Sequence, residues 1–150
     1  MVEKKYVGII GVALILVVIM ASGCIDNKKS GNNTTNSNTD TGSALTVTDL
    51  KVISQGYGSY DVKATITPNK DISYLEMVAI SYDSSGAIIE KNSMIWYVNE
   101  AKKGQVYKVT GHAYVTGNEK PVKMDILIFD SAFSSGNEEN NIFKQTVNIK

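Results

Sequence analysis

The 150-residue chain has one cysteine and one histidine, so a zinc or nucleophilic centre would have to be built on Cys24 or His112. A zinc site needs three or four clustered ligands, and a catalytic base needs an oriented partner. His112 stands among Lys108, Thr110 and Tyr114 on the polar phase of its segment. We therefore interpret His112 as a solvated surface histidine, and we predict no catalytic residue, no metal site and no cofactor.

Two acidic groupings carry the oxygen ligands that calcium prefers, Asp83-Ser84-Ser85 and Asp130 with Glu138 and Glu139. Asp83 is already explained by a turn that ends at Gly86, because its side chain can bond to the backbone there. The two glutamates are expected to lie in a solvent-exposed polar loop. Calcium binding is the alternative to these two interpretations.

Cys24 has very different neighbours. It follows a short charged head (Glu3-Lys4-Lys5), an apolar run over residues 7–20 and the small residues Ala21-Ser22-Gly23. This order is typical of a secretory leader. A cysteine directly after small residues resembles a lipoprotein signal, although Ala21 stands where leucine is usual. We predict a signal peptide over residues 1–23 and lipidation of Cys24. The predicted partner is membrane lipid, which the chain contacts through Cys24.

The alternative is an uncleaved transmembrane signal anchor. A spanning helix needs about 20 apolar residues to cross a ~30 Å hydrocarbon core. Residues 7–20 supply 14 residues, and residues 6–23 supply 18. This length favours a leader, and both interpretations place the rest of the chain on the extracytoplasmic face of the cell membrane.

Residues 24–43 predict a disordered tether. Apart from Cys24 and Ile25 they are almost entirely Asn, Thr, Ser, Asp, Lys and Gly, so no buried core would offset the entropy of ordering them. A flexible coil of about 19 residues spans ~25 Å on average. Asn32 and Asn33 each begin an Asn-x-Thr sequon and are candidate glycosylation sites. The alternative is that a tract this rich in Asn and Thr contains sequons by chance.

From residue 44 to the end, apolar residues tend to recur at every second position, which predicts β-strands. The expected strands cover residues 45–53, 60–66, 72–82, 87–90 with 94–98, 106–115, 122–128 and 142–149. The pair 87–90 and 94–98 is either two strands or one strand that resumes. About seven short strands predict an all-β, Ig-like antiparallel β-sandwich over residues 44–150. The alternation of apolar residues changes phase near Asp49, which predicts a bulge. Segment 72–82 is apolar on both faces of the expected strand, which predicts a central strand.

Tyr82-Asp83 followed by Gly86, and later Gly104 and Tyr107, are similar to the motif of the FxLYD domain. This family is a small β-sandwich module of prokaryotic membrane-attached and lipoprotein chains. The likeness covers about residues 62–109. Three positions depart from the family motif, namely Ala79, Ser81 and Lys103. The resemblance implies the sandwich fold and brings no catalytic residue or ligand.

Aromatic residues are the remaining candidates for a binding surface. Neighbouring strand residues point to opposite faces, so one of Trp96 and Tyr97 should be buried and the other exposed. Most of the tyrosines are expected to fill a small hydrophobic core, because aromatic side chains bury large areas. The alternative is a platform for sugar or peptide on one sheet face, with Tyr97 and Tyr114 as ligand-facing aromatics.

Charge narrows the range of functions. Fifteen basic residues balance fifteen acidic ones, and every basic residue is lysine, which argues against nucleic-acid recognition. We hypothesise a membrane-anchored extracytoplasmic lipoprotein with a non-catalytic module that binds envelope protein or glycan. One alternative is a structural envelope component that assembles with other surface proteins by strand addition. The other is a hydrolase of envelope material, for which an acid/base pair is missing.

Overall fold

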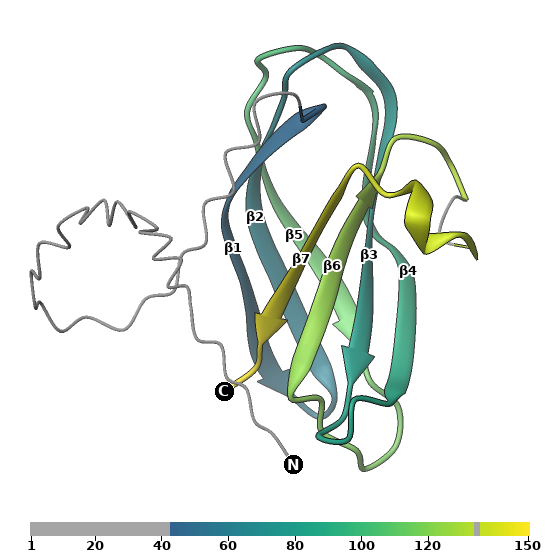
Figure 1. Cartoon of the computed structure of the whole chain (residues 1–150). Helices are drawn as coiled ribbons and strands as arrows, with labels where there is room; N and C mark the ends of the chain where they lie inside the picture. Colours follow the sequence, from purple (N-terminus) through teal and green to yellow (C-terminus); the bar gives the residue numbers. More distant parts are fainter. Residues whose placement is uncertain (1–42, 134–135) are drawn as a thin grey trace, which may run out of the picture. The chain divides into compact units, whose positions relative to one another are not determined.

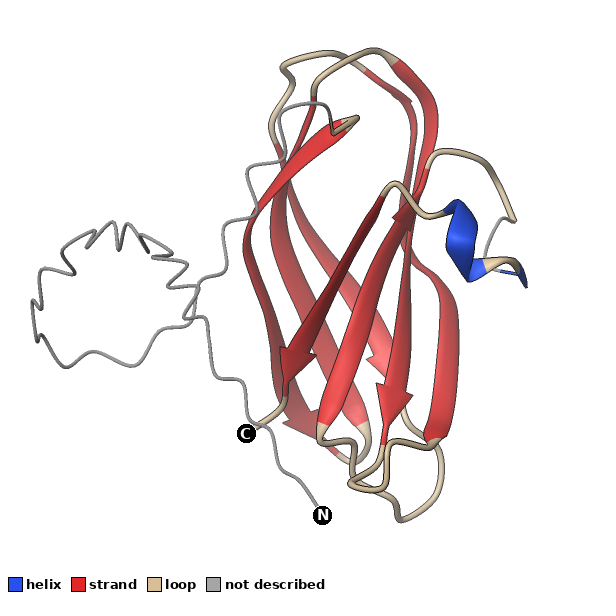
Figure 2. Cartoon of the chain, viewed as in Figure 1, coloured by secondary structure: helices blue, strands red, loops and turns tan. Residues whose placement is uncertain are grey.

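The computed structural model describes residues 43–133 and 136–150, which form two antiparallel β-sheets packed face to face (Figure 1). The strands are β1 (Leu45–Gly56), β2 (Ser59–Pro68), β3 (Ile72–Tyr82), β4 (Ile88–Ala101), β5 (Tyr107–Tyr114), β6 (Lys123–Phe129) and β7 (Phe143–Asn148). One sheet has the order β1-β2-β5 and the other the order β4-β3-β6-β7. The prediction of an all-β sandwich with seven strands is confirmed (Figure 2).

Several sequence predictions concern residues 1–42, which lie outside the described part of the chain. They are the leader, the tether, lipidation of Cys24 and glycosylation of Asn32 and Asn33. Within the described ranges, no helix is both long enough and apolar enough to cross a bilayer. These predictions therefore stay predictions.

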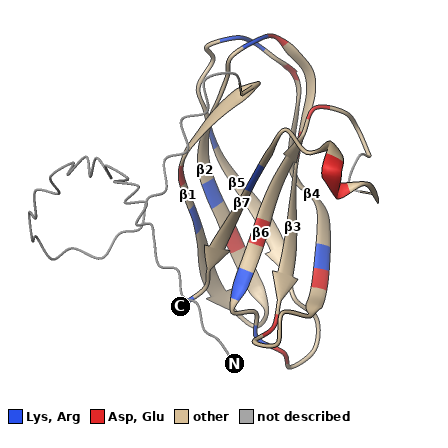
Figure 3. Cartoon of the chain, viewed as in Figure 1, with Lys and Arg blue, Asp and Glu red and all other residues tan. Residues whose placement is uncertain are grey.

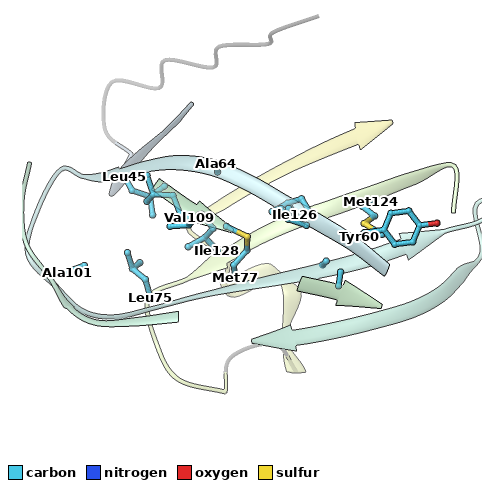
Figure 4. Packing of buried hydrophobic residues seen from close by; sticks show 14 of the residues in the cluster. Leu45, Tyr60, Ala64, Leu75, Met77, Ala101, Val109, Met124, Ile126 and Ile128 are labelled. Carbon is cyan, nitrogen blue, oxygen red and sulfur yellow. The ribbon is translucent and has the colours of Figure 1, made fainter. Parts of the chain in front are cut away.

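The main core lies between the sheets and follows from the alternation of the strands. In β2, Tyr60, Val62, Ala64 and Ile66 are buried, whereas the residues between them are only partly buried on the outer face. Leu75 and Met77 from β3 and Met124, Ile126 and Ile128 from β6 are fully buried and pack in the same cluster (Figure 4). Burial of each such side chain contributes about 1.5–3 kcal/mol.

The four-stranded sheet is buried on both faces along its central strands β3 and β6, as predicted for residues 72–82. Val78 and Ile80 on β3 form a second cluster with Leu127 and Phe129 on β6, and all four are fully buried. This outer cluster is crossed by the β6–β7 connection, which contains the short 3-10 helix η2 (Glu138–Asn140). Its Glu138 pairs with Lys91 on β4 at 3.1 Å.

Two strands contain irregularities that the sequence anticipated in part. The pairing of β1 with β2 shifts between Thr48 and Lys51, and Asp49 between them has a φ of 55°, so the predicted bulge is confirmed. The segments 87–90 and 94–98 belong to one strand, β4, which resumes across Met94 with a φ of 53°. The one-strand alternative is therefore the observed one.

The edge strands β4 and β5, from different sheets, meet along one side of the sandwich. The Asn92 side chain donates to the Tyr114 carbonyl at 2.7 Å and accepts from the Tyr114 N–H at 2.9 Å. The two strands approach closely at Gly111 on β5, because this residue has no side chain. A Cβ atom added there would lie 2.9 Å from the Ile95 side chain on β4. Asn92 thus satisfies backbone groups at the open edge of β5.

The β1–β2 turn yields a test of packing at Gly58. A Cβ at Gly58 would clash with the Val115 carbonyl oxygen, whereas a Cβ at Gly86 meets nothing within 4 Å. Both glycines have positive φ, at 76° and 88°, so both alanine variants carry similar backbone strain. We expect Gly86→Ala to cost about 1–2 kcal/mol, and Gly58→Ala to cost about 1–3 kcal/mol more. Denaturant unfolding measures both, and equal losses would contradict the predicted clash.

A tyrosine pair beside a buried carboxylate

The outer face of the four-stranded sheet brings Tyr74, Glu76 and Tyr97 together. Tyr74 and Glu76 are two residues apart on β3, so they share a face, and Tyr97 on β4 pairs directly with Glu76. The rings of Tyr74 and Tyr97 have centroids 6.3 Å apart and planes 22° apart. Tyr97 is 55 % exposed. The face therefore has two nearly parallel aromatic rings, of which Tyr97 is exposed and Tyr74 partly buried, next to a buried carboxylate.

Glu76 is fully buried, although its side chain is an ionisable carboxyl group. Its Oε2 accepts from the Tyr74 hydroxyl at 3.2 Å and from the Phe133 N–H at 3.4 Å. Its Oε1 has no hydrogen-bond partner, and no described lysine or histidine forms an ion pair with Glu76. Burial and the Glu76 carboxylate raise the pKa of Tyr74 above its ordinary value. Burying a carboxylate with so few partners costs free energy.

Asp125 on β6 is a second carboxylate on the same face, and it is fully satisfied. The neighbouring strands β6 and β7 carry acidic and basic positions (Figure 3). Asp125 accepts from Lys144 Nζ at 2.9 Å, Thr146 Oγ1 at 2.7 Å and Tyr82 Oη at 3.1 Å. Burial tends to raise the pKa of Asp125, but the bonds from Lys144 and Thr146, the Lys144 charge and the Tyr82 bond together lower it. The two carboxylates of this face thus have opposite environments.

The predicted aromatic residues are placed only in part as expected. Tyr97 is exposed, and Trp96 packs on the core with its ring edge-to-face with Tyr107, centroids 6.4 Å apart, so the division of this pair is confirmed. Tyr114 is 58 % exposed but lies on β5, in the other sheet. A platform of Tyr97 and Tyr114 on one sheet face is therefore wrong. The partner of Tyr97 is Tyr74, which cross-strand register brings near and local periodicity does not show.

His112 lies on the outer face of the three-stranded sheet, where its side chain is 68 % exposed, so the surface interpretation is confirmed. It has a partner that the sequence analysis missed. Its Nδ1 lies 3.0 Å from Asp61 Oδ1, because Asp61 is opposite it in the β2–β5 register. Asp61 also accepts from Gln55 Nε2 at 3.0 Å and lies 4.0 Å from Lys63 Nζ.

Of the acidic residues considered for calcium, Asp83 holds its own turn together. Asp83 Oδ1 accepts from Ser85 Oγ at 2.7 Å, from the Ser85 N–H at 2.8 Å and from the Ala87 N–H at 2.9 Å. These bonds, the one from the Ser85 hydroxyl first, lower the pKa of Asp83. Over residues 43–133 and 136–150, no three or more His, Cys, Asp or Glu side chains gather as a metal site would require.

Comparison with known proteins yields no family. No family model and no curated protein matches the chain. It is similar to part of a GH3 beta-glucosidase from Bifidobacterium adolescentis, with TM-score 0.41 and 12 % identity over 71 % of this chain and 17 % of that one. It is also similar to part of beta-glucosidase 3B from Thermotoga neapolitana, with TM-score 0.39 and 11 % identity over 72 % of this chain and 16 % of that one. The chain thus spans under a fifth of these enzymes, and the likeness carries no argument about activity.

Tyr82 provides a pH test of the Asp125 network. Burial and the adjacent Asp125 carboxylate raise the pKa of Tyr82 to about 12, whereas an unfolded tyrosine titrates near about 10. The folded state therefore favours the protonated phenol. The contribution of Tyr82 to stability is fully present below about pH 10 and is lost as the pH rises toward 12.

We expect the free energy of unfolding to fall more steeply between pH 10 and 12 in the wild type than in Tyr82→Phe. Denaturant unfolding at several pH values, with the same Tyr82→Phe chain as the control, measures the difference. Parallel pH profiles of the two proteins would contradict the predicted coupling.

Proposed function

We propose that the chain is a membrane-anchored extracytoplasmic lipoprotein whose β-sandwich is a non-catalytic binding or interaction module. The observation that carries the binding role is the exposed Tyr97, stacked on the partly buried Tyr74 beside the incompletely satisfied Glu76. Exposed aromatic side chains give large contact areas at low conformational cost. The anchor rests on the sequence of the leader and Cys24.

The main alternative is a structural envelope component that pairs its strand edges with other proteins. Three observations favour the binding module over this alternative. Asn92 occupies part of the β5 edge, the Asp49 bulge interrupts the β1 edge, and β7 is only six residues long and carries Lys144. Bulges, short edge strands and lysines are features by which natural sheets avoid edge pairing.

The resemblance to the FxLYD domain supports the same proposal. Tyr82 ends β3 and Asp83 begins the hairpin turn in which Gly86 has a φ of 88°. Gly104, with a φ of 75°, lies in the β4–β5 turn, and Tyr107 begins β5. These residues lie at strand ends and turns of this chain.

Binding through the tyrosine pair is tested with two matched variants. Tyr97 and Tyr114 are exposed to nearly the same degree but lie on different sheets. We expect full-length protein in mild detergent to bind members of an array of envelope glycans and surface peptides. Tyr97→Ala should weaken that binding by about tenfold or more, because an aromatic anchor is lost. Tyr114→Ala should leave it unchanged, and the reverse order of effects would place the site on the other sheet.

The lipid anchor is tested by Cys24→Ser. Two acyl chains hold a protein stably at a membrane, whereas one holds it only transiently. We expect the wild-type mature N-terminus to be a diacylated Cys24 in mass spectrometry. The Cys24→Ser chain should be released from membranes or retain its uncut leader. A serine variant that is cleaved and membrane-bound like the wild type would refute lipid anchoring.

A further inference from the structure

We infer that the outer face of the four-stranded sheet binds a primary alkylammonium group at Glu76, next to the rings of Tyr74 and Tyr97. The inference deepens the proposed binding role by naming a ligand class. It rests on the proposal that the domain binds a ligand, and it does not depend on the lipid anchor.

The argument begins with the missing positive charge. Asp125 shows how this sheet face accommodates a carboxylate, with a lysine at 2.9 Å and two hydroxyl donors. Glu76 is more deeply buried than Asp125 but has only two long hydrogen bonds, both to Oε2, and no cationic partner in the described residues. A buried carboxylate without a counter-charge is destabilising. A cation supplied from outside would remove that penalty when it binds.

The neighbours of Glu76 define the kind of cation. Aromatic rings attract cations over their faces, and the Tyr74–Tyr97 pair lies directly beside the carboxylate. Oε1 lacks a hydrogen-bond donor, so the favoured cation is one that can also donate a hydrogen bond. A primary ammonium has both properties, whereas a quaternary ammonium has only the charge. A divalent metal would require further carboxylate or histidine ligands, and the described residues around Glu76 offer none.

Glu76 is fully buried, and the exposed side chain beside it is Tyr97. This side chain is directly across from Glu76 and more than half exposed, while its neighbour Trp96 packs inward on the core. A ligand that reaches Oε1 would have to displace the Tyr97 side chain, which is not part of the core between the sheets. The backbone of Glu76 is held by Leu75 and Met77, which are both fully buried on the inner face.

The ammonium group can belong to a lysine side chain of a partner protein or to a small free amine. Two sets of probes separate these sources. The first set is n-butylammonium chloride, tetramethylammonium chloride and n-butanol. The second is the peptide acetyl-Gly-Lys-Gly-amide and its norleucine counterpart.

We expect n-butylammonium to raise the melting temperature of the full-length chain in mild detergent, saturably. Tetramethylammonium should bind about tenfold more weakly, since it cannot donate to Oε1, and n-butanol should have no effect. The lysine peptide should also bind and the norleucine peptide should not. A peptide affinity well above that of n-butylammonium indicates a protein partner, and equal affinities indicate a free amine.

The decisive variant is Glu76→Gln, which removes the charge and keeps the shape. We expect it to weaken n-butylammonium binding by about tenfold or more. Without amine, its melting temperature should equal or exceed that of the wild type, because an uncompensated buried charge is gone. A merely structural Glu76 would instead make this variant less stable.

Asp125→Asn is the matched control on the same sheet face. It should lower the melting temperature, because it breaks the Lys144 ion pair, and it should still bind n-butylammonium like the wild type. The inference is overturned if n-butylammonium causes no saturable shift, or if Glu76→Gln binds it normally. If Tyr97→Ala abolishes array binding while n-butylammonium does not bind, the binding module stands and only the ammonium ligand is refuted.

Discussion

The structure depends on burying both faces of the central strands β3 and β6. Their inner faces form the core between the sheets, and their outer faces carry the fully buried Val78, Ile80, Leu127 and Phe129. A sheet face that is not covered by a second sheet normally meets water and carries polar residues. Here the β6–β7 connection crosses that face instead. A polar group that is buried on this face therefore needs a partner within the protein or in a ligand.

The two carboxylates of this face respond to that constraint in opposite ways. Asp125 is held by Lys144, Thr146 and Tyr82, and these contacts link β6 to β7 and to the end of β3. Glu76 is held by long bonds to Oε2 alone. Natural proteins retain such unfavourable groups where function needs them, at a cost in stability. This contrast, more than the number of tyrosines, is the reason for proposing one end of the sheet face as a binding site.

Local patterns in the sequence predicted most of the fold. The alternation in residues 60–66, the double apolar phase of residues 72–82 and the turn at Asp83 all depend on near neighbours in the chain, and all are confirmed. The phase shift at Asp49 also marked a real bulge. These features are readable because strand periodicity and turn chemistry act within a few residues.

The candidate site was only half predictable, because it depends on register between distant strands. Tyr97 could be identified as exposed, but its partner Tyr74 is brought near by the β3–β4 register and not by spacing. The same holds for His112 and Asp61, which are 51 residues apart. Tyr114 was grouped with Tyr97 because the sequence does not show which sheet a strand joins. Glu76 attracted no notice, since a single glutamate in an apolar strand resembles a surface residue until its cover is known.

The burial that makes Glu76 costly also makes it a precise site. Leu75 and Met77, on either side of it, are fixed between the sheets, so the backbone of Glu76 is held and its side chain points to the outer face. Tyr74 holds Oε2 from the same strand, which leaves Oε1 as the unused acceptor. A ligand then finds its acceptor already oriented, and little entropy is lost on binding. A surface glutamate with the same tyrosines would be hydrated and mobile, and water would compete for the ammonium group.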